Sequence, residues 1–327
     1  MFYCIHRKET DPYFNLAAEE YMLREFPHDA FMVWWNDRSV IIGKHQNASR
    51  EINHAYCTEH SIPVIRRITG GGTVYHDLGN INFSFITMGE PGKLVDFHKF
   101  TAPVIDFLGS LGLNAQFEGK NNIMINGAKV SGNAAHVYKN RVIHHGTLLY
   151  NANLEALESS IAGNEILYND RSVRSVRTSV MNLKQLLGEN MSAAEFSRKF
   201  FDHIVNLFSP SALIYEWKDR EIEKIRELKK SRYLDPMWNM GYSPDYNFHN
   251  SFGFNDENIV IRLTVKKGKI EEAKISSTGN RNTELKQIEK SLRGMSHDRY
   301  SVAGLLSDLN YSVDEKGLGK ALLDNMF

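Results

Sequence analysis

Cysteine is scarce in this chain, since only Cys4 and Cys57 occur among its 327 residues. No CxxC pair and no disulfide framework can be drawn, so we expect a reducing compartment. No uncharged apolar run reaches the roughly 18 residues that a membrane-spanning helix needs. Residues 1–15 mix charged with apolar side chains, so no signal-peptide core is expected there. These absences together predict a cytoplasmic protein without a membrane span.

An excess of charge of either sign is also missing. Lys plus Arg and Asp plus Glu each number 39, so the formal net charge is zero. Domains that coat nucleic acid are usually clearly basic, so this balance argues against a nucleic-acid partner, although it permits a local basic pocket for one phosphate group. The length allows two domains, one large and one small. A monomer is the default expectation.

Helical and β-prone segments mix along the first 240 residues. Helix formers and a following proline predict a helix over residues 14–26. Further helices are expected over residues 51–60, 97–111 and 192–208, the last opened by a capping box from Ser192 to Glu195. The expected strands are residues 31–35, 39–43, 63–68, 80–86, 121–126, 127–132 and 146–151.

Three of these strands carry more specific expectations. The runs 31–35 and 39–43 flank Asn36 and Asp37, which predicts a β-hairpin. The strand 80–86 alternates with period two, so one face is expected to differ from the other. Its apolar face would hold Ile81, Phe83 and Phe85, and its polar face Asn82 and Ser84.

A segment dense in turn residues and aromatics, 232–247, marks a domain boundary. We therefore divide the chain into a large domain, 1–240, and a small domain, 241–327. The small domain is expected to hold a hairpin over 258–277 and helices over 283–292 and 301–309. The fold class that we predict is α+β, with a large domain of mixed or antiparallel sheets flanked by helices and a small α+β C-terminal domain.

The stretch RRITGGGTVYHDLGN, residues 66–80, has more glycine than a turn requires. Gly70, Gly71 and Gly72 would let backbone N–H groups approach an anion, and the preceding arginines supply forked donors. Neither a P-loop nor a dinucleotide fingerprint is present. We interpret the stretch as a phosphate or carboxylate site, with a plain turn as the alternative. For His76 and Asp77 we favour a turn-stabilising pair over a general base with its orienter.

Two further stretches carry candidate groups. Lys129 lies between Gly127 and Gly132; a strand lysine is usually a solvated edge charge, but bracketing glycines favour close approach to something else. His144 and His145 lack a third ligand at usable spacing, so no metal site is expected. Neither cysteine lies beside a glycine loop, which argues against a cysteine nucleophile.

Taken together, these stretches resemble the lipoate–protein ligase A family. RRITGGGTVYHDLGNINFSFI is similar to the glycine signature of that family, INGAKVSGNA to its lysine motif, and HHGTLLYNANL to a third motif. Weaker similarity extends over nearly the whole chain. Where the family often has GRND, residues 119–122 read GKNN, so the chain lacks the acidic residue that a metal contact at Asn122 would use.

The resemblance implies an ATP-dependent ligase that works in two steps. Lipoate and ATP would give lipoyl-AMP and pyrophosphate, and the lipoyl group would then pass to a lysine of a lipoyl carrier domain, either an E2 subunit of a 2-oxoacid dehydrogenase or the glycine-cleavage H protein. Mg²⁺ would accompany the phosphates without a dedicated protein cage.

The resemblance also assigns roles to residues. It makes Lys129 the catalytic residue, a protonated amine that holds the carboxylate and the α-phosphate, and it sets Arg67 against phosphate charge. Val74, Tyr75 and the strand 80–86 are candidates for the slot of the apolar tail. The implied substrate-binding residues are Arg67, Gly70, Gly71, Gly72, Thr73, Val74, Tyr75, His76, Asp77, Asn80, Lys129, Ser131, Gly132, His145, Gly146 and Thr147.

Other functions remain open at this point. An octanoyl- or lipoyltransferase of the same fold would use a cysteine thioester or preformed acyl-AMP, and a non-catalytic acyl or nucleotide sensor would keep the scaffold alone. A biotin ligase is disfavoured because its GRGRxG-type loop is absent. The lack of a well-placed cysteine and the presence of a small C-terminal domain favour the ligase.

Overall fold

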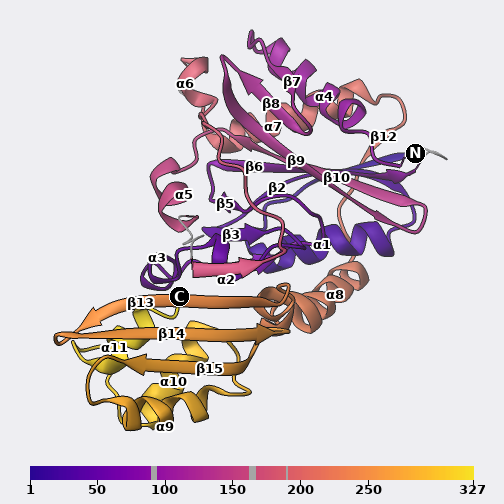
Figure 1. Cartoon of the computed structure of the whole chain (residues 1–327). Helices are drawn as coiled ribbons and strands as arrows, with labels where there is room; N and C mark the ends of the chain where they lie inside the picture. Colours follow the sequence, from indigo (N-terminus) through magenta and orange to yellow (C-terminus); the bar gives the residue numbers. More distant parts are fainter. Residues whose placement is uncertain (90–93, 162–166, 189–190) are drawn as a thin grey trace.

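The computed structural model of the chain describes residues 1–89, 94–161, 167–188 and 191–327. Figure 1 shows a larger body built around a twisted sheet and, below it, a smaller body formed by the C-terminal residues. Among the described residues, no helix is long and apolar enough to cross a membrane. The mixture of sheets and helices in both bodies confirms the predicted α+β fold class.

An eight-stranded sheet organises the larger body. β1 pairs in parallel with β2 and β12, whereas the pairs from β2 onward to β7 are antiparallel, so the sheet is mixed as predicted. Its strands, in spatial order, are β12 (Ala212–Ile214), β1 (Phe2–His6), β2 (Asp29–Trp35), β6 (Asn80–Met88), β10 (Arg141–Leu149), β9 (Ala128–Tyr138), β8 (Asn122–Ile125) and β7 (Gln116–Glu118).

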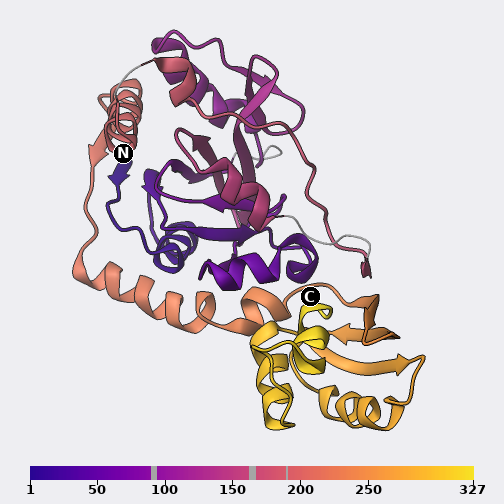
Figure 2. The ribbon, with the colours of Figure 1, turned by 90° about the vertical axis from the view of Figure 1, so that its left-hand side faces the viewer.

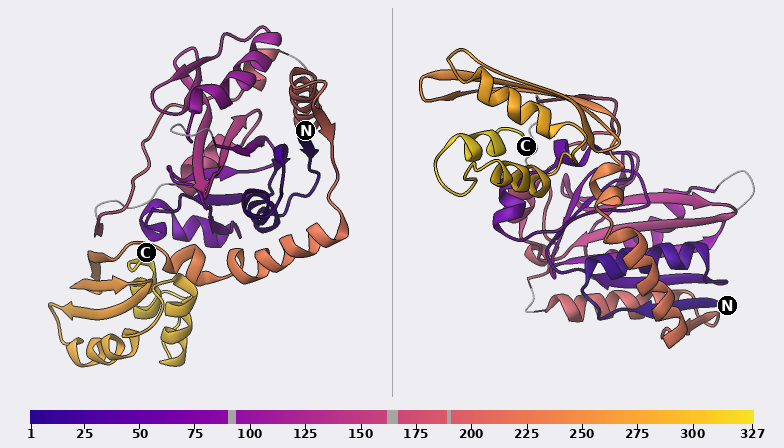
Figure 3. Two further views of the ribbon diagram at one scale, coloured as in Figure 1. Left: turned by 90° about the vertical axis from the view of Figure 1, so that its right-hand side faces the viewer. Right: turned by 90° about the horizontal axis from the view of Figure 1, so that it is seen from below.

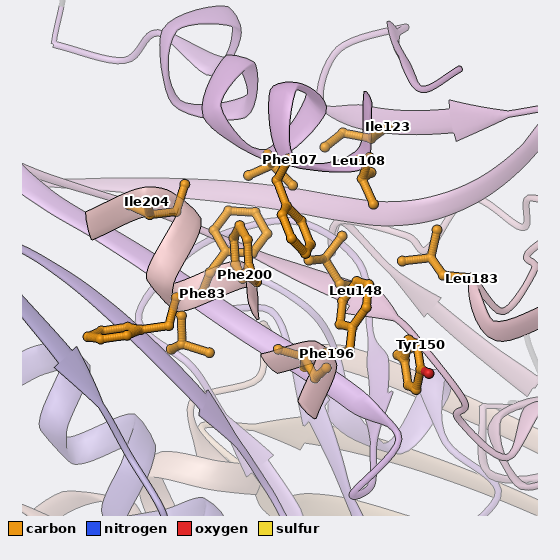
Figure 4. Close-up of a cluster of buried hydrophobic side chains, with 14 of the residues drawn as sticks. Phe83, Phe107, Leu108, Ile123, Leu148, Tyr150, Leu183, Phe196, Phe200 and Ile204 are labelled. Carbon is orange, nitrogen blue, oxygen red and sulfur yellow. The ribbon is translucent and has the colours of Figure 1, made fainter. Parts of the chain in front are cut away.

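Helices α4 (Phe97–Ser110) and α7 (Ala193–Leu207) cover one face of this sheet through an aromatic core. Figure 4 shows Phe83 of β6, Phe107 of α4 and Phe200 of α7 meeting there. The ring centroids of Phe83 and Phe107 lie 5.8 Å and 5.0 Å from that of Phe200. The predicted alternation of β6 is confirmed, because Ile81, Phe83 and Phe85 all belong to this core.

The opposite face of the sheet carries the polar side of β6 and a second core. Helix α1 (Pro12–Arg24) packs there together with α8 (Asp219–Leu228) and a three-stranded sheet, in the order β4 (Val64–Arg66), β3 (Ser39–Ile42) and β5 (Val74–His76). The strand β2 serves both cores, with Phe31 in the first and Met32 and Trp34 in the second. Polar side chains of β6 therefore face the side on which α1 and the small sheet lie.

Helix α1 begins two residues earlier than the predicted range 14–26. The Asp11 carboxylate caps its first turn by accepting from the backbone N–H groups of Tyr13 and Phe14, and Pro12 fits the first helical position because that position needs no N–H donor. The segment predicted as one helix over 51–60 is two short helices, α2 (Ala48–Glu51) and α3 (His54–Glu59). The break occurs because Asn53 leaves the helix and caps α3 through Tyr56 N–H.

The predicted hairpin around Asn36 and Asp37 is wrong. β2 pairs with β1 and β6, whereas β3 belongs to the three-stranded sheet, so the two strands separate after the turn. The cause lies in the turn itself: the side chain of Asn36 is buried and bonded to Asn15 and His76, which holds the chain between the two sheets.

The other expected elements of the larger body are present. The capping box of Ser192 and Glu195 opens α7, and α4 ends one residue before its predicted end. The expected strands around Lys129 and Gly146 are found as β8, β9 and β10, with β9 and β10 longer than predicted. Two short helices complete this body, α5 (Leu154–Ser160) and α6 (Lys184–Leu187).

The smaller body packs three helices on one face of a four-stranded sheet, which the view from below in Figure 3 also shows. The hairpin predicted over 258–277 is confirmed as β14 and β15, and the two predicted helices as α9 and α10. The elements of this body, in chain order, are β11 (Tyr168–Asp170), β13 (Tyr246–Phe254), β14 (Glu257–Lys266), β15 (Lys269–Ser277), α9 (Asn282–Leu292), α10 (Arg299–Asp308) and α11 (Leu318–Asp324).

A strand from the middle of the chain joins this smaller sheet. β11 pairs antiparallel with β13. It does so although β11 ends at residue 170, well before the boundary segment that begins at residue 232. Our division of the chain at residues 240 and 241 stays a prediction. The pairing shows, however, that the segment leaving β11 is attached to the smaller body at its start.

Helix α8 and two single π-helical turns, Lys229–Tyr233 and Met237–Gly241, form the connection between the bodies. Figure 2 shows α8 running beneath the larger body toward the smaller one. The buried carboxylate of Glu20 on α1 fastens this connection by pairing with Arg24 and Arg232 and accepting from the hydroxyl of Tyr233.

The aromatic core generates a stability prediction. Phe200→Ala removes a fully buried ring from contact with Phe83 and Phe107, so the free energy of unfolding should fall by about 3–5 kcal/mol. Leu207→Ala is a matched control on the same helix, because Leu207 is 50% exposed and should change stability by at most about 0.5 kcal/mol. Urea denaturation followed by circular dichroism measures both, and equal losses in the two variants would contradict this description of the core.

Candidate functional site

A cavity of about 550 Å³ lies on the polar side of β6. Its size falls in the range of small-molecule sites. The parts of the chain that line it include the glycine loop, the strands β9 and β10, and the segment 173–178. Its lining residues outside the predicted set include the apolar Leu16, Trp34 and Ile41 and the polar Asn82, Lys120, Asn122, Asn133, Arg174 and Ser175.

Most of the predicted site residues meet at this cavity. Those that line it are Arg67, Gly71, Gly72, Thr73, Val74, His76, Lys129, Gly132, His145, Gly146 and Thr147. Among the described residues, the predicted ones outside the lining are Gly70, Tyr75, Asp77, Asn80 and Ser131. Residues far apart in the sequence are therefore brought together at one cavity.

The Arg67 side chain binds the backbone of the glycine loop. Its guanidinium donates from Nη2 to the carbonyl oxygens of Gly70 at 2.6 Å and Gly72 at 2.8 Å, from Nη1 to that of Ile41, and from Nε to Thr69 Oγ1. Burial lowers the pKa of Arg67 to about 10, with the neighbouring Glu19 opposing that shift. The fork is engaged with the loop itself, and the expected contact of Arg67 with phosphate stays a prediction.

A buried chain of hydrogen bonds continues from Arg67 to helix α1. Thr69 Oγ1 lies 2.8 Å from His145 Nε2, and His145 Nδ1 lies 2.8 Å from the Glu19 carboxylate. The donors are consistent with one tautomer, in which Nδ1 carries the proton and Nε2 accepts from the threonine hydroxyl. Glu19 also accepts from Ser84 Oγ on β6. The glycine loop is thus braced against the large sheet through a continuous polar path.

The glycines of the loop differ in whether the backbone or the available space requires glycine. Gly71 has φ +92°, a conformation that a side chain would strain, and its backbone turns over the guanidinium of Arg67. A Cβ at Gly70 would instead meet open space. Part of the predicted anion nest is already used within the chain, because Thr73 N–H donates to Ser175 Oγ at 2.9 Å.

Lys129 lies on β9 with its amine beside the cavity, not at a solvated edge. A Cβ at Gly132 would fall 2.8 Å from Lys129 Cε and Nζ, so glycine at that position gives the lysine side chain its place. The backbone of Lys129 is fixed by hydrogen bonds to Ser179 and Met181. Burial, and secondarily the charge of Arg67, lower the pKa of Lys129 from its ordinary value. Binding of an anion would relieve both effects.

Asp77 is a turn residue, in agreement with the reading that we favoured. Its carboxylate accepts from the backbone N–H groups of Gly79, Asn80 and Asn153, which fixes the turn into β6. The His76 side chain bonds to Asn36, outside this turn, and it is not a general base. Burial, with Arg67 and His145 as lesser causes, lowers the pKa of His76 to about 3, and its Nδ1 accepts from Asn36. Its ring is therefore neutral at physiological pH, and its edge lines the cavity.

The two adjacent histidines point to opposite faces of β10. His145 belongs to the polar path at the cavity, whereas His144 stacks on Phe100 at 4.1 Å in the aromatic core, where burial lowers its pKa to about 4. Within the described residues, no group of three or more His, Cys, Asp or Glu side chains could hold a metal ion. Both cysteines are buried outside the lining of the cavity, and burial raises the pKa of each to about 12.

The apolar part of the lining differs from the predicted one. Val74 lines the cavity as expected, but Tyr75 is buried in a separate cluster, and Ile81, Phe83 and Phe85 of strand 80–86 face the aromatic core. Asn82 is the residue of that strand at the cavity. Strand alternation explains the difference, because neighbouring side chains of a strand point to opposite faces. Val74 and Tyr75 therefore cannot both face the cavity, and neither can Asn82 and its neighbours on β6.

Sequence reasoning missed several residues of the site. Glu19 lies in a helix of ordinary composition, and Gln46 and Ser175 lie in loops, so their residue types alone carried no signal. Gln46 Oε1 accepts from Thr73 Oγ1 and from Gly43 N–H, and its Nε2 donates to Ser175 Oγ. Trp34 could have been found, because it lies on β2 beside the polar side of β6. Its Nε1 donates to Ser84 Oγ on that side.

The assembled site combines cationic groups with an apolar wall. Lys129, Arg174 and Lys120 supply positive charge, whereas Leu16, Trp34, Ile41 and Val74 supply apolar surface. Such a cavity fits a ligand with an anionic part and an apolar part.

Comparison with known proteins gives the same family over both bodies. Residues 11–205 match the lipoyl protein ligase A/B catalytic domain, and residues 243–322 match the bacterial lipoate protein ligase C-terminus. The chain is 38% identical to lipoate–protein ligase 1 of Staphylococcus aureus over 91% of each chain. It is 36% identical to the lipoate–protein ligase LplJ of Bacillus subtilis over 95% of each chain.

A solved structure supports the same likeness. The crystal structure of a lipoate–protein ligase A bound with ATP matches 74% of this chain and all of its own length. The TM-score is 0.63 and the sequence identity 26%.

The environment of Lys129 generates a pH prediction. Because burial and Arg67 disfavour the charged amine, Lys129 should lose its proton below the ordinary value of 10.5, and addition of ATP should shift its pKa upward. Titration of ¹⁵Nζ-labelled lysines by NMR measures this, with the Lys129→Arg variant assigning the signal. A midpoint at or above 10.5 in the ligand-free protein would contradict the described environment.

Proposed function

Because the chain belongs to the lipoate–protein ligase family, we propose that it activates lipoate with ATP and transfers the lipoyl group to a lysine of a lipoyl carrier domain. It is an enzyme of the ligase class. The observation that carries the proposal is the half-buried amine of Lys129, which lies over Gly132 at a cavity walled by the glycine loop.

In the first step, a carboxylate oxygen of lipoate attacks the α-phosphorus of ATP, and the bond to pyrophosphate breaks. Negative charge grows on the phosphoryl oxygens, where the fixed ammonium group of Lys129 stabilises it. Its surroundings favour this role, because a charge that is poorly solvated before the reaction gains most from an anionic partner. The role is electrostatic and leaves the lysine unmodified.

In the second step, the amine of the carrier lysine attacks the acyl carbon of lipoyl-AMP, loses a proton and releases AMP. The mixed anhydride must be kept from water until the carrier arrives. Segment 173–178 supports this requirement, because it forms one wall of the cavity and rests on the glycine loop through Ser175.

The buried cysteines support the ligase over a transferase that uses a thioester. Cys4 and Cys57 lie outside the lining of the cavity, and their raised pKa values disfavour the thiolate that would attack an acyl group. A sensor without activity would not need a desolvated lysine at this place.

Mg²⁺, the carriers and the compartment complete the proposal. We assign Mg²⁺ to the phosphates of the nucleotide, because the described residues offer no cluster of metal ligands. As carriers we propose E2 subunits of 2-oxoacid dehydrogenases and the glycine-cleavage H protein, and as compartment the cytoplasm, where two free cysteines remain reduced.

Pyrophosphate release without any carrier tests the proposed function. The wild-type protein should release pyrophosphate from ATP with lipoate but not with biotin, and Lys129→Ala should lower the rate on the order of a hundredfold or more. Lys199→Ala is the control, since Lys199 is an exposed lysine of α7, and circular dichroism should show all variants folded. Lipoate-independent release, or full activity of Lys129→Ala, would contradict the proposal.

A further inference from the structure

Segment 170–176 is fastened to the larger body at two points that flank Arg174. The first is Asp170 at the end of β11, which accepts from Arg50 Nη1 at 3.2 Å and from Asn47 Nδ2 at 3.0 Å. The side chains of Arg50 and Asp170 are 1% and 0% exposed, so this is a buried attachment.

The second point is Ser175, whose hydroxyl is a junction of three hydrogen bonds. It donates to the Glu51 carboxylate, and it accepts from Gln46 Nε2 at 3.1 Å and from Thr73 N–H at 2.9 Å. The backbone N–H of Ser175 also donates to Glu51 at 3.3 Å. One side chain therefore joins the segment to α2 and to the glycine loop at once.

Arg174 lies between these attachments with its neighbours fixed on both sides. Val173 N–H donates to the carbonyl oxygen of His45 at 3.1 Å, and Ser175 is held as described. Arg174 itself lines the cavity while its side chain is exposed. Its backbone is thus positioned before any ligand binds, so less conformational entropy is lost when its guanidinium meets a phosphate group.

We infer that Glu51 and Ser175 are positioning residues that hold Arg174 at the cavity for the phosphates of the nucleotide. This inference rests on the proposed function. Glu51 acts as the acceptor that fixes Ser175, and Ser175 transmits that position to Arg174 on one side and to Thr73 of the glycine loop on the other. Both residues are assigned to act through Arg174 and Thr73.

The helix that carries Glu51 is also attached to the connection between the two bodies. Ala48 N–H at the start of α2 donates to Ser243 Oγ at 3.1 Å, and Arg66 Nη2 donates to the same oxygen at 3.0 Å. β11, which leads into Asp170, pairs with β13 of the smaller body. Both attachments of segment 170–176 therefore depend on elements that contact the smaller body.

Kinetics of pyrophosphate release with ATP varied, together with hydrogen exchange of the ligand-free protein, tests the inference. Ser175→Ala and Glu51→Ala should raise KM for ATP about tenfold while kcat changes less than about threefold, because nucleotide binding now includes ordering Arg174. Amides of residues 171–176 should exchange faster with no ligand present. Glu51→Gln should restore KM, since its amide oxygen still accepts from Ser175. Glu59→Ala, an exposed glutamate of α3, is the matched control.

Each outcome is informative. Unchanged KM with unchanged exchange would overturn the inference, as would a lower KM, which would mean that Ser175 competes with ligand for Thr73 N–H. A parallel fall of kcat and melting temperature would reduce the pair to a structural role and overturn it as well. If the wild type released no pyrophosphate, the proposed function would fail, and the exchange data would still decide whether the attachment exists.

Discussion

The site depends on the buried guanidinium of Arg67, which contacts no carboxylate among the residues that the structure describes. Arg67 directs its fork into carbonyl oxygens of the glycine loop, and this arrangement gives the loop a fixed shape although glycine has the highest conformational freedom. The charge is tolerated because its donors are satisfied and because Glu19 lies further along the path through Thr69 and His145. The positive charge of Arg67 also disfavours the protonated form of Lys129. The guanidinium that holds the loop therefore makes binding of an anion in the cavity more favourable.

The architecture connects this site to the smaller body through a second buried guanidinium. Arg66 donates to carbonyl oxygens of residues 43, 44 and 46 beside the glycine loop, and to those of Trp238 and Asn239 in the connecting segment. Burial lowers the pKa of Arg66 to about 10, which reflects how completely it is enclosed. The adjacent arginines 66 and 67 thus have different roles: Arg67 lines the cavity, whereas Arg66, the last residue of β4, bonds to the connecting segment. The Arg66 side chain therefore bonds both to the connecting segment and to the loop over residues 43–46.

Much of this could be predicted from local patterns, whereas the failures depend on hydrogen-bond partners that residue types alone do not reveal. The period-two alternation of β6 and the capping box of α7 were read correctly because both depend on neighbouring residues alone. The turn at Asn36 was misread because its outcome depends on hydrogen bonds to Asn15 and His76, which are distant in sequence. The glycine motif located the cavity, but the engagement of Arg67 with the loop could not be seen, since its acceptors there are backbone carbonyls, whose positions residue types do not reveal. Glu19 was missed for the same reason: its partner His145 lies 126 residues away.

The central claim is that Arg67 shapes the glycine loop and that Lys129 supplies the charge which meets the reacting phosphate. A crystal structure of the protein with a bound, non-hydrolysable lipoyl-adenylate analogue tests this most directly. The account predicts that Arg67 Nη2 stays within hydrogen-bonding distance of the carbonyl oxygens of Gly70 and Gly72, and that Lys129 Nζ donates to the phosphate and to the acyl oxygen. A structure in which Arg67 has left those carbonyls to bind the phosphate, with Lys129 turned away from it, would contradict the account.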